Sequence, residues 1–212
     1  MPSWQTHMVN GLLRLAVKHR TFRDLRRIRK KVEKLDSRWS KMPADVSAND
    51  EVIEDLSCRW IRVPESRPSY LILYFHGGAF CLRTPKGHSA FLARLCRGVG
   101  ATGLMPDYRL APEHPFPAAP EDCFRIYRWL LSSGYDPMKI IVAGDSAGGG
   151  LTLSTLVQIR DAGIPNPIGG VMFSPATDMT LSGESFGTNL KKDAMFTLPN
   201  LLKVRTASLR SN

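Results

Sequence analysis

A serine flanked by glycines is the residue of this sequence best suited to chemistry. The motif consists of Gly144, Asp145, Ser146, Ala147 and Gly148. It follows an apolar run, residues 139–143, and precedes a helix-like segment, residues 151–159. A serine on a tight turn between a strand and a helix exposes its hydroxyl, and flanking glycines are needed because side chains there would collide with the neighbouring elements. We therefore predict that Ser146 is a nucleophile; the alternative is a glycine-rich helix start.

A second segment of small residues follows a buried-strand pattern, residues 70–75. It reads His76, Gly77, Gly78, Ala79 and Phe80. Small residues leave backbone N–H groups free to point at a ligand, and each such donor stabilises the charge on an attacked carbonyl oxygen by roughly 3 kcal/mol. The predicted oxyanion hole consists of the N–H groups of Gly77, Gly78, Ala79 and Ala147. We interpret His76 as a structural residue that orients this loop.

Together with further segments, these motifs resemble the hormone-sensitive-lipase family of α/β-hydrolases, which includes the bacterial family IV esterases. The resemblance is carried by His76-Gly77-Gly78, the block 107–122, the elbow 144–149, Ser174-Pro175 and Thr177-Asp178. It implies an α/β-hydrolase fold, with a mostly parallel sheet, helices on both faces and an N-terminal helical cap. It also implies a carboxylic-ester hydrolase that uses a serine nucleophile and an acyl-enzyme on short- to medium-chain acyl esters, without cofactor or metal.

The catalytic acid and the catalytic histidine that a serine nucleophile needs are not recognised after Ser146 in this sequence. A hydrolase of this fold has its acid and its histidine after the serine. All five histidines precede Ser146: His7, His19, His76, His88 and His114. Asp178 and Asp193 lie downstream, but they match family positions before the catalytic acid. We expect a C-terminally truncated chain that lacks the triad acid, the triad histidine and the last two strands, with impaired activity. The alternative is a non-catalytic ligand-binding protein or pseudoenzyme of the same family.

Two residues depart from the family pattern. Ala79 replaces the third glycine of the usual His-Gly-Gly-Gly, which suits a backbone donor only if its φ is negative or the strain is small. Ala176 stands where the family usually has tryptophan, so the sequence does not define the shape of one wall of the acyl pocket.

Positive charge is concentrated near the N-terminus. The 212 residues carry a formal net charge of +10, and residues 1–41 hold twelve Lys or Arg and three Asp or Glu, a net +9. Apolar residues at helical spacing alternate there with basic ones, as in an amphipathic helix over residues 22–39, with a shorter one before it over residues 8–16. We interpret residues 1–45 as a helical cap segment with a solvated basic face, and residues 46–212 as an incomplete catalytic domain. The rival interpretation is weak contact with an anionic membrane surface; no nucleic-acid partner is expected.

The remaining composition is ordinary. The hydrophobic fraction of 43% suits one domain with a sizeable core. No apolar run approaches the length of a membrane span and no leader signal is recognised, so we expect a cytoplasmic protein. We expect buried free thiols rather than zinc ligands or disulfides at Cys58, Cys81, Cys96 and Cys123. Residues 111–120 are interpreted as a rigid connector, with Arg109, Glu113 and His114 in a structural turn rather than an ionic or metal cluster.

Hydrophobic patterning predicts a single α/β layer structure. Strands are expected at residues 51–56, 58–63, 70–75, 102–106, 139–143 and 170–174, and helices at residues 89–99, 120–131 and 151–159. The last strand would leave apolar residues on an exposed edge: Val171, Met172 and Phe173. We expect self-association through that edge, because unpaired strand edges and uncovered apolar surface favour it.

Overall fold

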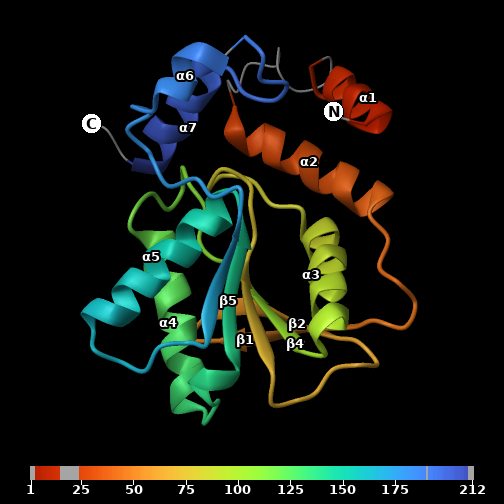
Figure 1. Cartoon of the computed structure of the whole chain (residues 1–212), viewed down its shortest axis with the longest axis vertical. Coiled ribbons are helices and arrows are strands. Elements are labelled where there is room, and N and C mark those ends of the chain that lie inside the picture. Colours follow the sequence, from red (N-terminus) through yellow and green to blue (C-terminus); the bar gives the residue numbers. More distant parts are fainter. Residues whose placement is uncertain (1–2, 15–23, 190, 210–212) are drawn as a thin grey trace.

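The computed structural model describes residues 3–14, 24–189 and 191–209. In these residues the order of elements is α1 (Trp4–Leu13), α2 (Leu25–Trp39), β1 (Ser47–Ile53), β2 (Leu56–Arg62), β3 (Leu71–Phe75), α3 (Pro85–Val99), β4 (Thr102–Pro106), α4 (Ala118–Ser132), η2 (Pro137–Lys139), β5 (Ile140–Asp145), α5 (Ala147–Asp161), β6 (Gly169–Phe173), α6 (Glu184–Asn189) and α7 (Leu198–Leu209). Figure 1 shows the sheet between α3 on one side and α4 and α5 on the other, with α1, α2, α6 and α7 gathered at one end. The predicted α/β layers are confirmed.

The described strands form one mixed sheet in the order β1-β2-β4-β3-β5-β6. The β1–β2 and β2–β4 pairs are antiparallel, whereas β3 pairs in parallel with β4 and with β5, and β5 pairs in parallel with β6. Phe75, at the end of β3, lies opposite Gly144 near the end of β5. The loops that carry His76 and Ser146 therefore leave the sheet side by side.

Strand β3 lies between two hydrophobic clusters, one on each face of the sheet. Side chains alternate along a strand, so Leu71, Leu73 and Phe75 join the cluster under α4 and α5. Ile72 and Tyr74 join the cluster under α3. All five residues of β3 are buried, which explains the continuous apolar run in the sequence.

The first strand differs from its prediction. We expected a strand over residues 51–56, but β1 ends at Ile53 and a two-residue turn leads into β2. Both turn residues, Glu54 and Asp55, have positive φ angles, 50° and 64°. Such a turn matches the twist of a hairpin, but it is usually signalled by Asn-Gly or Asp-Gly, and this sequence has neither there.

Three helices, α3, α4 and α5, begin earlier than predicted. Helix α3 begins at Pro85, because proline suits the first helical position, and α5 begins at Ala147, directly after the candidate nucleophile. Of the shorter N-terminal helix, α1 covers Trp4–Leu13, and the remainder of the predicted span lies partly outside the described residues. Residues 22 and 23 of the second predicted helix also lie outside them.

Helix α2 is held by polar contacts more than by an apolar stripe. Ile28 and Val32 are partly buried as expected, but the Leu35 side chain is 54% exposed. Asp36 is buried instead, and its carboxylate accepts hydrogen bonds from the backbone N–H groups of Lys86 and Gly87 at 2.8 Å. It thereby satisfies two of the free donors at the start of α3, which has no side-chain cap of its own.

The four cysteines are buried and free, as predicted. Burial raises the pKa of Cys58 and Cys96 to about 12, so these thiols are unreactive. The described part of the chain contains no helix long and apolar enough to cross a bilayer, and no cluster of His, Cys, Asp or Glu able to hold a metal ion. Glu113 in the proline-rich connector pairs with Arg26 and Arg29 of α2, so this turn does have an ionic role: it ties the connector to the helical end of the molecule.

Candidate active site

Ser146 occupies a strained turn between β5 and α5. Its φ and ψ angles are 51° and −117°, a conformation that L-residues rarely adopt outside functional sites. Its N–H donates to the Phe173 carbonyl at 2.9 Å, which anchors the turn to β6. Glycine is required on both sides, since a Cβ at Gly144 would overlap the Gly148 carbonyl and a Cβ at Gly148 would overlap the Phe75 carbonyl. The close approach of β3, β5 and α5 thus fixes the serine at the sheet edge.

One expected oxyanion donor needs correction. The Gly77 N–H donates to Asp145 Oδ1 at 2.7 Å and is therefore not available to a substrate oxygen. The N–H groups of Gly78, Ala79 and Ala147 donate to no other described residue, and Ala147 is the first residue of α5, where the helix itself leaves N–H groups free. Three of the four predicted donors remain free.

Asp145 links the loop to the sheet, a role that the sequence did not reveal. Its Oδ1 accepts hydrogen bonds from Gly77 N–H and, at 2.6 Å, from the Tyr74 hydroxyl, and His88 Nε2 lies 3.5 Å away. Burial opposes ionisation of this carboxyl, but the hydrogen bonds from His88 and Tyr74 outweigh burial and lower the pKa of Asp145. A Cβ at Gly77 would overlap the Asp145 carboxylate. Glycine at this position therefore permits the contact.

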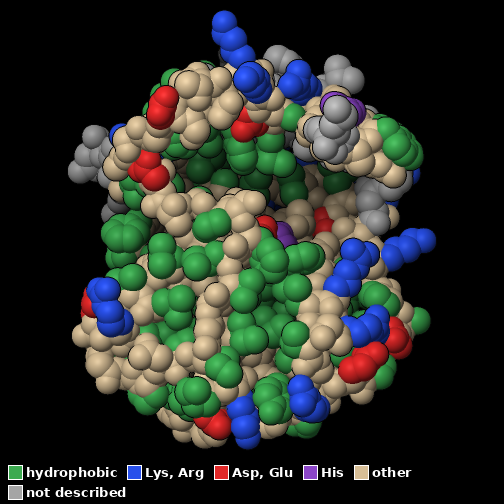
Figure 2. Space-filling view, in the orientation of Figure 1, with side chains coloured by type: hydrophobic (Ala, Val, Ile, Leu, Met, Phe, Trp, Pro, Cys, Tyr) green, Lys and Arg blue, Asp and Glu red, His purple; other side chains and the backbone are tan. Residues whose placement is uncertain are grey.

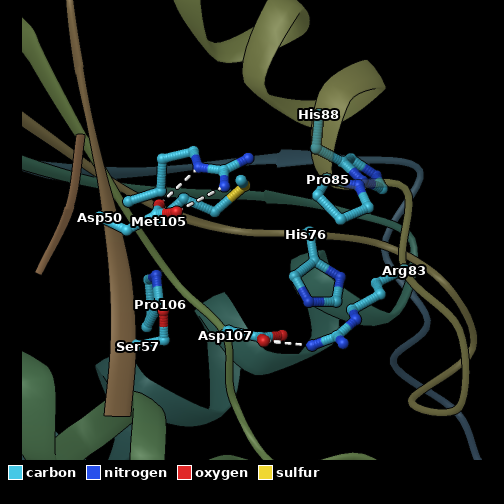
Figure 3. A pocket seen from close by; sticks show the side chains of 10 residues that line it. Asp50, Ser57, His76, Arg83, Pro85, His88, Met105, Pro106 and Asp107 are labelled. Carbon is cyan, nitrogen blue, oxygen red and sulfur yellow. Dashed lines mark hydrogen bonds and ion pairs between the residues drawn. The ribbon is translucent and has the colours of Figure 1, made fainter. Parts of the chain in front are cut away.

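His76 is buried and lines a different pocket from Ser146. Its ring stacks on Tyr108 with centroids 4.4 Å apart, and burial lowers the pKa of His76 to about 4, so the ring is neutral at pH 7. Because the Gly77 carbonyl, 2.8 Å from Nδ1, can only accept, Nδ1 carries the proton. Nε2 is buried without a hydrogen-bond partner among the described residues, and His76 lines a pocket of about 200 Å³ together with Arg83, His88 and Asp107 (Figure 3).

Ser146 lines a larger pocket of about 510 Å³ between the body and the helical end. Ala79 and Ala147 line it too, and the opposite wall is mostly apolar: Met179, Leu181, Phe186, Phe196, Leu201 and Val204. Figure 2 shows the hollow, with hydrophobic side chains along its depth. Asp178 and Asp193 also belong to the lining, but no histidine is among the described residues that form it.

The two aspartates of this pocket are held by local turns. Asp178 accepts hydrogen bonds from the backbone N–H and hydroxyl groups of Thr180 and Ser182, which lower the pKa of Asp178 to about 2. Asp193 accepts from the N–H groups of Met195 and Phe196. Both carboxylates are thus engaged close to their own positions in the chain, in keeping with their omission from the predicted triad.

The two departures from the family pattern both lie at this pocket. Ala79 has a φ of 54°, so it adopts the left-handed conformation that was expected to be strained, at about 1–2 kcal/mol for a residue with a side chain. Ala176 and Met179 line both the Ser146 pocket and an adjoining apolar pocket of about 200 Å³. A small residue at position 176 leaves space on this wall.

Comparison with known proteins agrees with this architecture. A family model described as alpha/beta hydrolase fold matches residues 72–212, more than half of the chain. The chain belongs to this family. A solved esterase from the bacterial hormone-sensitive lipase family has a TM-score of 0.90 at 34% identity, covering 100% of this chain and 71% of that chain. The predicted resemblance to hormone-sensitive lipases is confirmed.

Other relatives of this hydrolase-family chain are longer than it is. The crystal structure of EstE5 soaked by ethyl alcohol has a TM-score of 0.92 at 34% identity, covering 99% of this chain and 70% of that chain. The acetyl-hydrolase of Streptomyces hygroscopicus is 37% identical over 148 residues, which are 70% of this chain and 49% of that protein. The matched segments span half or less of the curated relatives' length.

Proposed function

We propose that this chain carries the nucleophile and the oxyanion hole of a serine carboxylic-ester hydrolase. The observation that carries the proposal is the strained turn at Ser146, which lines a pocket beside the free N–H groups of Ala79 and Ala147. A volume of about 510 Å³ and an apolar wall suit short- to medium-chain acyl esters. Relatives described as acetyl-hydrolase and esterase support an acyl ester as the substrate class.

In the proposed reaction, Ser146 Oγ attacks the acyl carbon and its proton passes to a base. The carbonyl oxygen gains negative charge, which the N–H groups of Gly78, Ala79 and Ala147 stabilise by roughly 3 kcal/mol per donor. The bond to the alcohol then breaks, and the base returns the proton to the departing alcohol. Water attacks the acyl-enzyme in the second half of the reaction, releasing the acid and restoring Ser146.

The base and its acid are the groups that this proposal still requires. In the hydrolase fold both follow the serine along the chain, and the sequence has no histidine after Ser146. Loss of a triad member lowers turnover by several orders of magnitude and leaves only oxyanion and binding effects. The second candidate function, a non-catalytic ligand-binding protein, is favoured by the absence of histidine from the described pocket lining.

A chimera separates the two functions. Residues 1–209 would be joined to the unmatched C-terminal part of a solved esterase of the family, and hydrolysis of p-nitrophenyl butyrate would be compared with that of the 212-residue chain. We expect the 212 residues alone to act barely above background, with Ser146→Ala making little difference, and the chimera to gain at least a thousandfold.

A second serine of the same pocket provides the matched control. In the chimera Ser146→Ala should abolish turnover, whereas Ser185→Ala, which removes another hydroxyl from the pocket lining, should retain most of it. A folded chimera that binds butyrate esters without turnover would favour the non-catalytic function. Ser146-dependent turnover by the 212 residues alone would show that the base is among them.

A further inference from the structure

Helix α2 has an inner face that is fastened to the body by charged groups. Arg29 donates from Nε to the Cys81 carbonyl and from Nη2 to the Ala111 carbonyl, both at 2.7 Å, and also pairs with Glu113. Glu33 pairs with Arg83 at 2.7 Å. Together with Asp36 at the start of α3, these contacts use both acidic side chains that lie inside α2. The helix is therefore a fixed part of the molecule.

The outer face of α2 is basic and unbalanced. Lys30, Lys31 and Lys34 are exposed, and no described residue forms an ion pair or hydrogen bond with their side chains. Their spacing of three and four residues puts Lys30 and Lys31 beside Lys34 on one stripe of the helix. Arg27 extends the stripe by one turn toward the N-terminus. Positive charge along this stripe is not needed to dock α2, because the inner face does that.

The imbalance is a property of the N-terminal segment of the sequence and not of the whole chain. Residues 1–41 account for +9 of the net charge of +10, so the rest of the chain is almost neutral. A surface of one sign attracts oppositely charged partners over roughly a Debye length, about 8 Å at physiological salt. A partner that binds this face through its charge would therefore be anionic.

Exposed apolar side chains lie at the same end. Leu35, next to Lys34, is 54% exposed, and α1 presents Trp4 and Met8, which are 70% and 54% exposed and one turn apart. Figure 1 shows α1 and α2 together at this end. Tryptophan and leucine among lysines suit the boundary between lipid headgroups and acyl chains. A nucleic-acid backbone offers them no comparable environment.

We propose that the outer face of α2, formed by Arg27, Lys30, Lys31, Lys34 and Leu35, docks the protein onto an anionic lipid surface. Because Arg29 binds the Cys81 carbonyl and Glu33 binds Arg83, the docking helix is joined directly to the loop that follows Ala79. The surface contact therefore holds the whole body at the bilayer. This inference is independent of the proposed hydrolysis, because binding needs neither Ser146 nor a base.

Vesicle flotation tests the proposal, since bound protein rises with the vesicles while aggregated protein sinks. The full 212-residue chain would be mixed with vesicles of phosphatidylcholine containing 30% phosphatidylglycerol, or of phosphatidylcholine alone, at 0.05 and 0.5 M salt. Each lysine near an anionic surface contributes roughly fivefold to partitioning, so Lys30→Gln, Lys31→Gln and Lys34→Gln together should reduce it roughly a hundredfold. Glutamine keeps a helix propensity close to that of lysine.

The matched control removes the same charge from the body. Arg94, Arg128 and Arg160 are exposed on α3, α4 and α5, and their triple change to glutamine should leave partitioning within about twofold. We expect binding to the anionic vesicles at low salt only, with circular dichroism unchanged in both variants. Equal loss in the two triple variants, equal binding to neutral vesicles, or lysine-dependent binding to duplex DNA in place of vesicles would each overturn the proposal.

Discussion

Strands β3 and β6 flank the same strand, β5, and each pairs with it in parallel through five residue pairs. All five residues of β3 are buried, whereas every residue of β6 is exposed or only partly buried. Backbone pairing is therefore equal on the two sides of Ser146, but side-chain burial is not. Pairing aligns the turn with its neighbours, and burial holds it there.

The consequence for the site is an asymmetry in how firmly its parts are fixed. On the β3 side, Tyr74, Gly77 and Asp145 form a partly buried network that holds the loop of the proposed oxyanion hole. On the β6 side, Phe173 accepts the Ser146 N–H, yet its own side chain is partly open to solvent and packs edge-on against Phe91. Substitutions should therefore have large effects on the β3 side and small ones on the β6 side.

A pair of glycines gives the largest predicted contrast. Gly148→Ala forces a Cβ into the Phe75 carbonyl, so backbone must move, and we expect a loss of about 4 kcal/mol or more in the free energy of unfolding, or no folded protein. Gly169→Ala in β6 meets no atom within 4 Å and should change it by less than about 0.5 kcal/mol. Urea denaturation followed by circular dichroism measures both. Similar losses in the two variants would remove the proposed asymmetry.

The sequence predicted those parts of the site that depend on neighbours in the chain. Ser146 and its glycines could be recognised because a nucleophile elbow is a local turn with fixed spacing. The network around Asp145 could not, because Tyr74 lies 71 residues away and no periodicity shows which buried hydroxyl will reach the motif. The error at Gly77 has the same origin: whether an N–H is free depends on a distant carboxylate.

In the fold, too, the sequence predicted the local features and missed those that depend on unusual turns or distant contacts. Buried strands such as β3 were recognised from their apolar runs, and the layers followed from their alternation with helices. The hairpin at Glu54 and Asp55 was missed because its turn uses non-glycine residues with positive φ. The inner face of α2 was also missed, since Asp36 is buried by its bonds to the start of α3, which helical periodicity does not reveal.

Acidification should weaken the β3 side specifically. Burial lowers the pKa of His76 from 6.5 to about 4, so the folded state binds this proton more weakly than the unfolded state. The contribution of neutral His76 to the free energy of unfolding is fully present above pH 6.5. It is lost as the pH falls toward 4, which decreases the free energy of unfolding by about 3 kcal/mol. Asp145, whose folded pKa is also lowered, loses its contribution only below its unfolded value of about 3.8.

Urea denaturation between pH 7.5 and 4.5 measures the slope of the free energy of unfolding against pH. His76→Asn should flatten it, because asparagine can still donate to the Gly77 carbonyl but does not titrate. His114→Asn, at an exposed position, should leave it unchanged. A wild-type stability that is constant over this range would contradict the assignment of a neutral, buried His76.

Strain in the loop of the proposed oxyanion hole predicts a smaller effect of opposite sign. Ala79→Gly removes the Cβ from a residue with φ of 54° and should raise the free energy of unfolding by up to about 1 kcal/mol, after the added freedom of the unfolded chain is subtracted. Ala90→Gly, inside α3, should lower it by about 1 kcal/mol instead. Thermal unfolding measures both. Destabilisation by Ala79→Gly would mean that the loop is not strained.

The smallest effect on stability, and the clearest on association, is predicted at the sheet edges. We propose that β6 mediates self-association, because Val171, Met172 and Phe173 form an exposed apolar strip, whereas β1 exposes mostly polar residues around Val52. Val171→Lys should reduce light scattering and hydrophobic dye binding while changing the free energy of unfolding by roughly 0.5 kcal/mol. Val52→Lys introduces the same charge on the opposite edge, at a side chain that is 73% exposed, and should change neither light scattering nor dye binding. A wild-type chain that is monodisperse, monomeric and free of bound dye would show that an open β6 edge does not drive association.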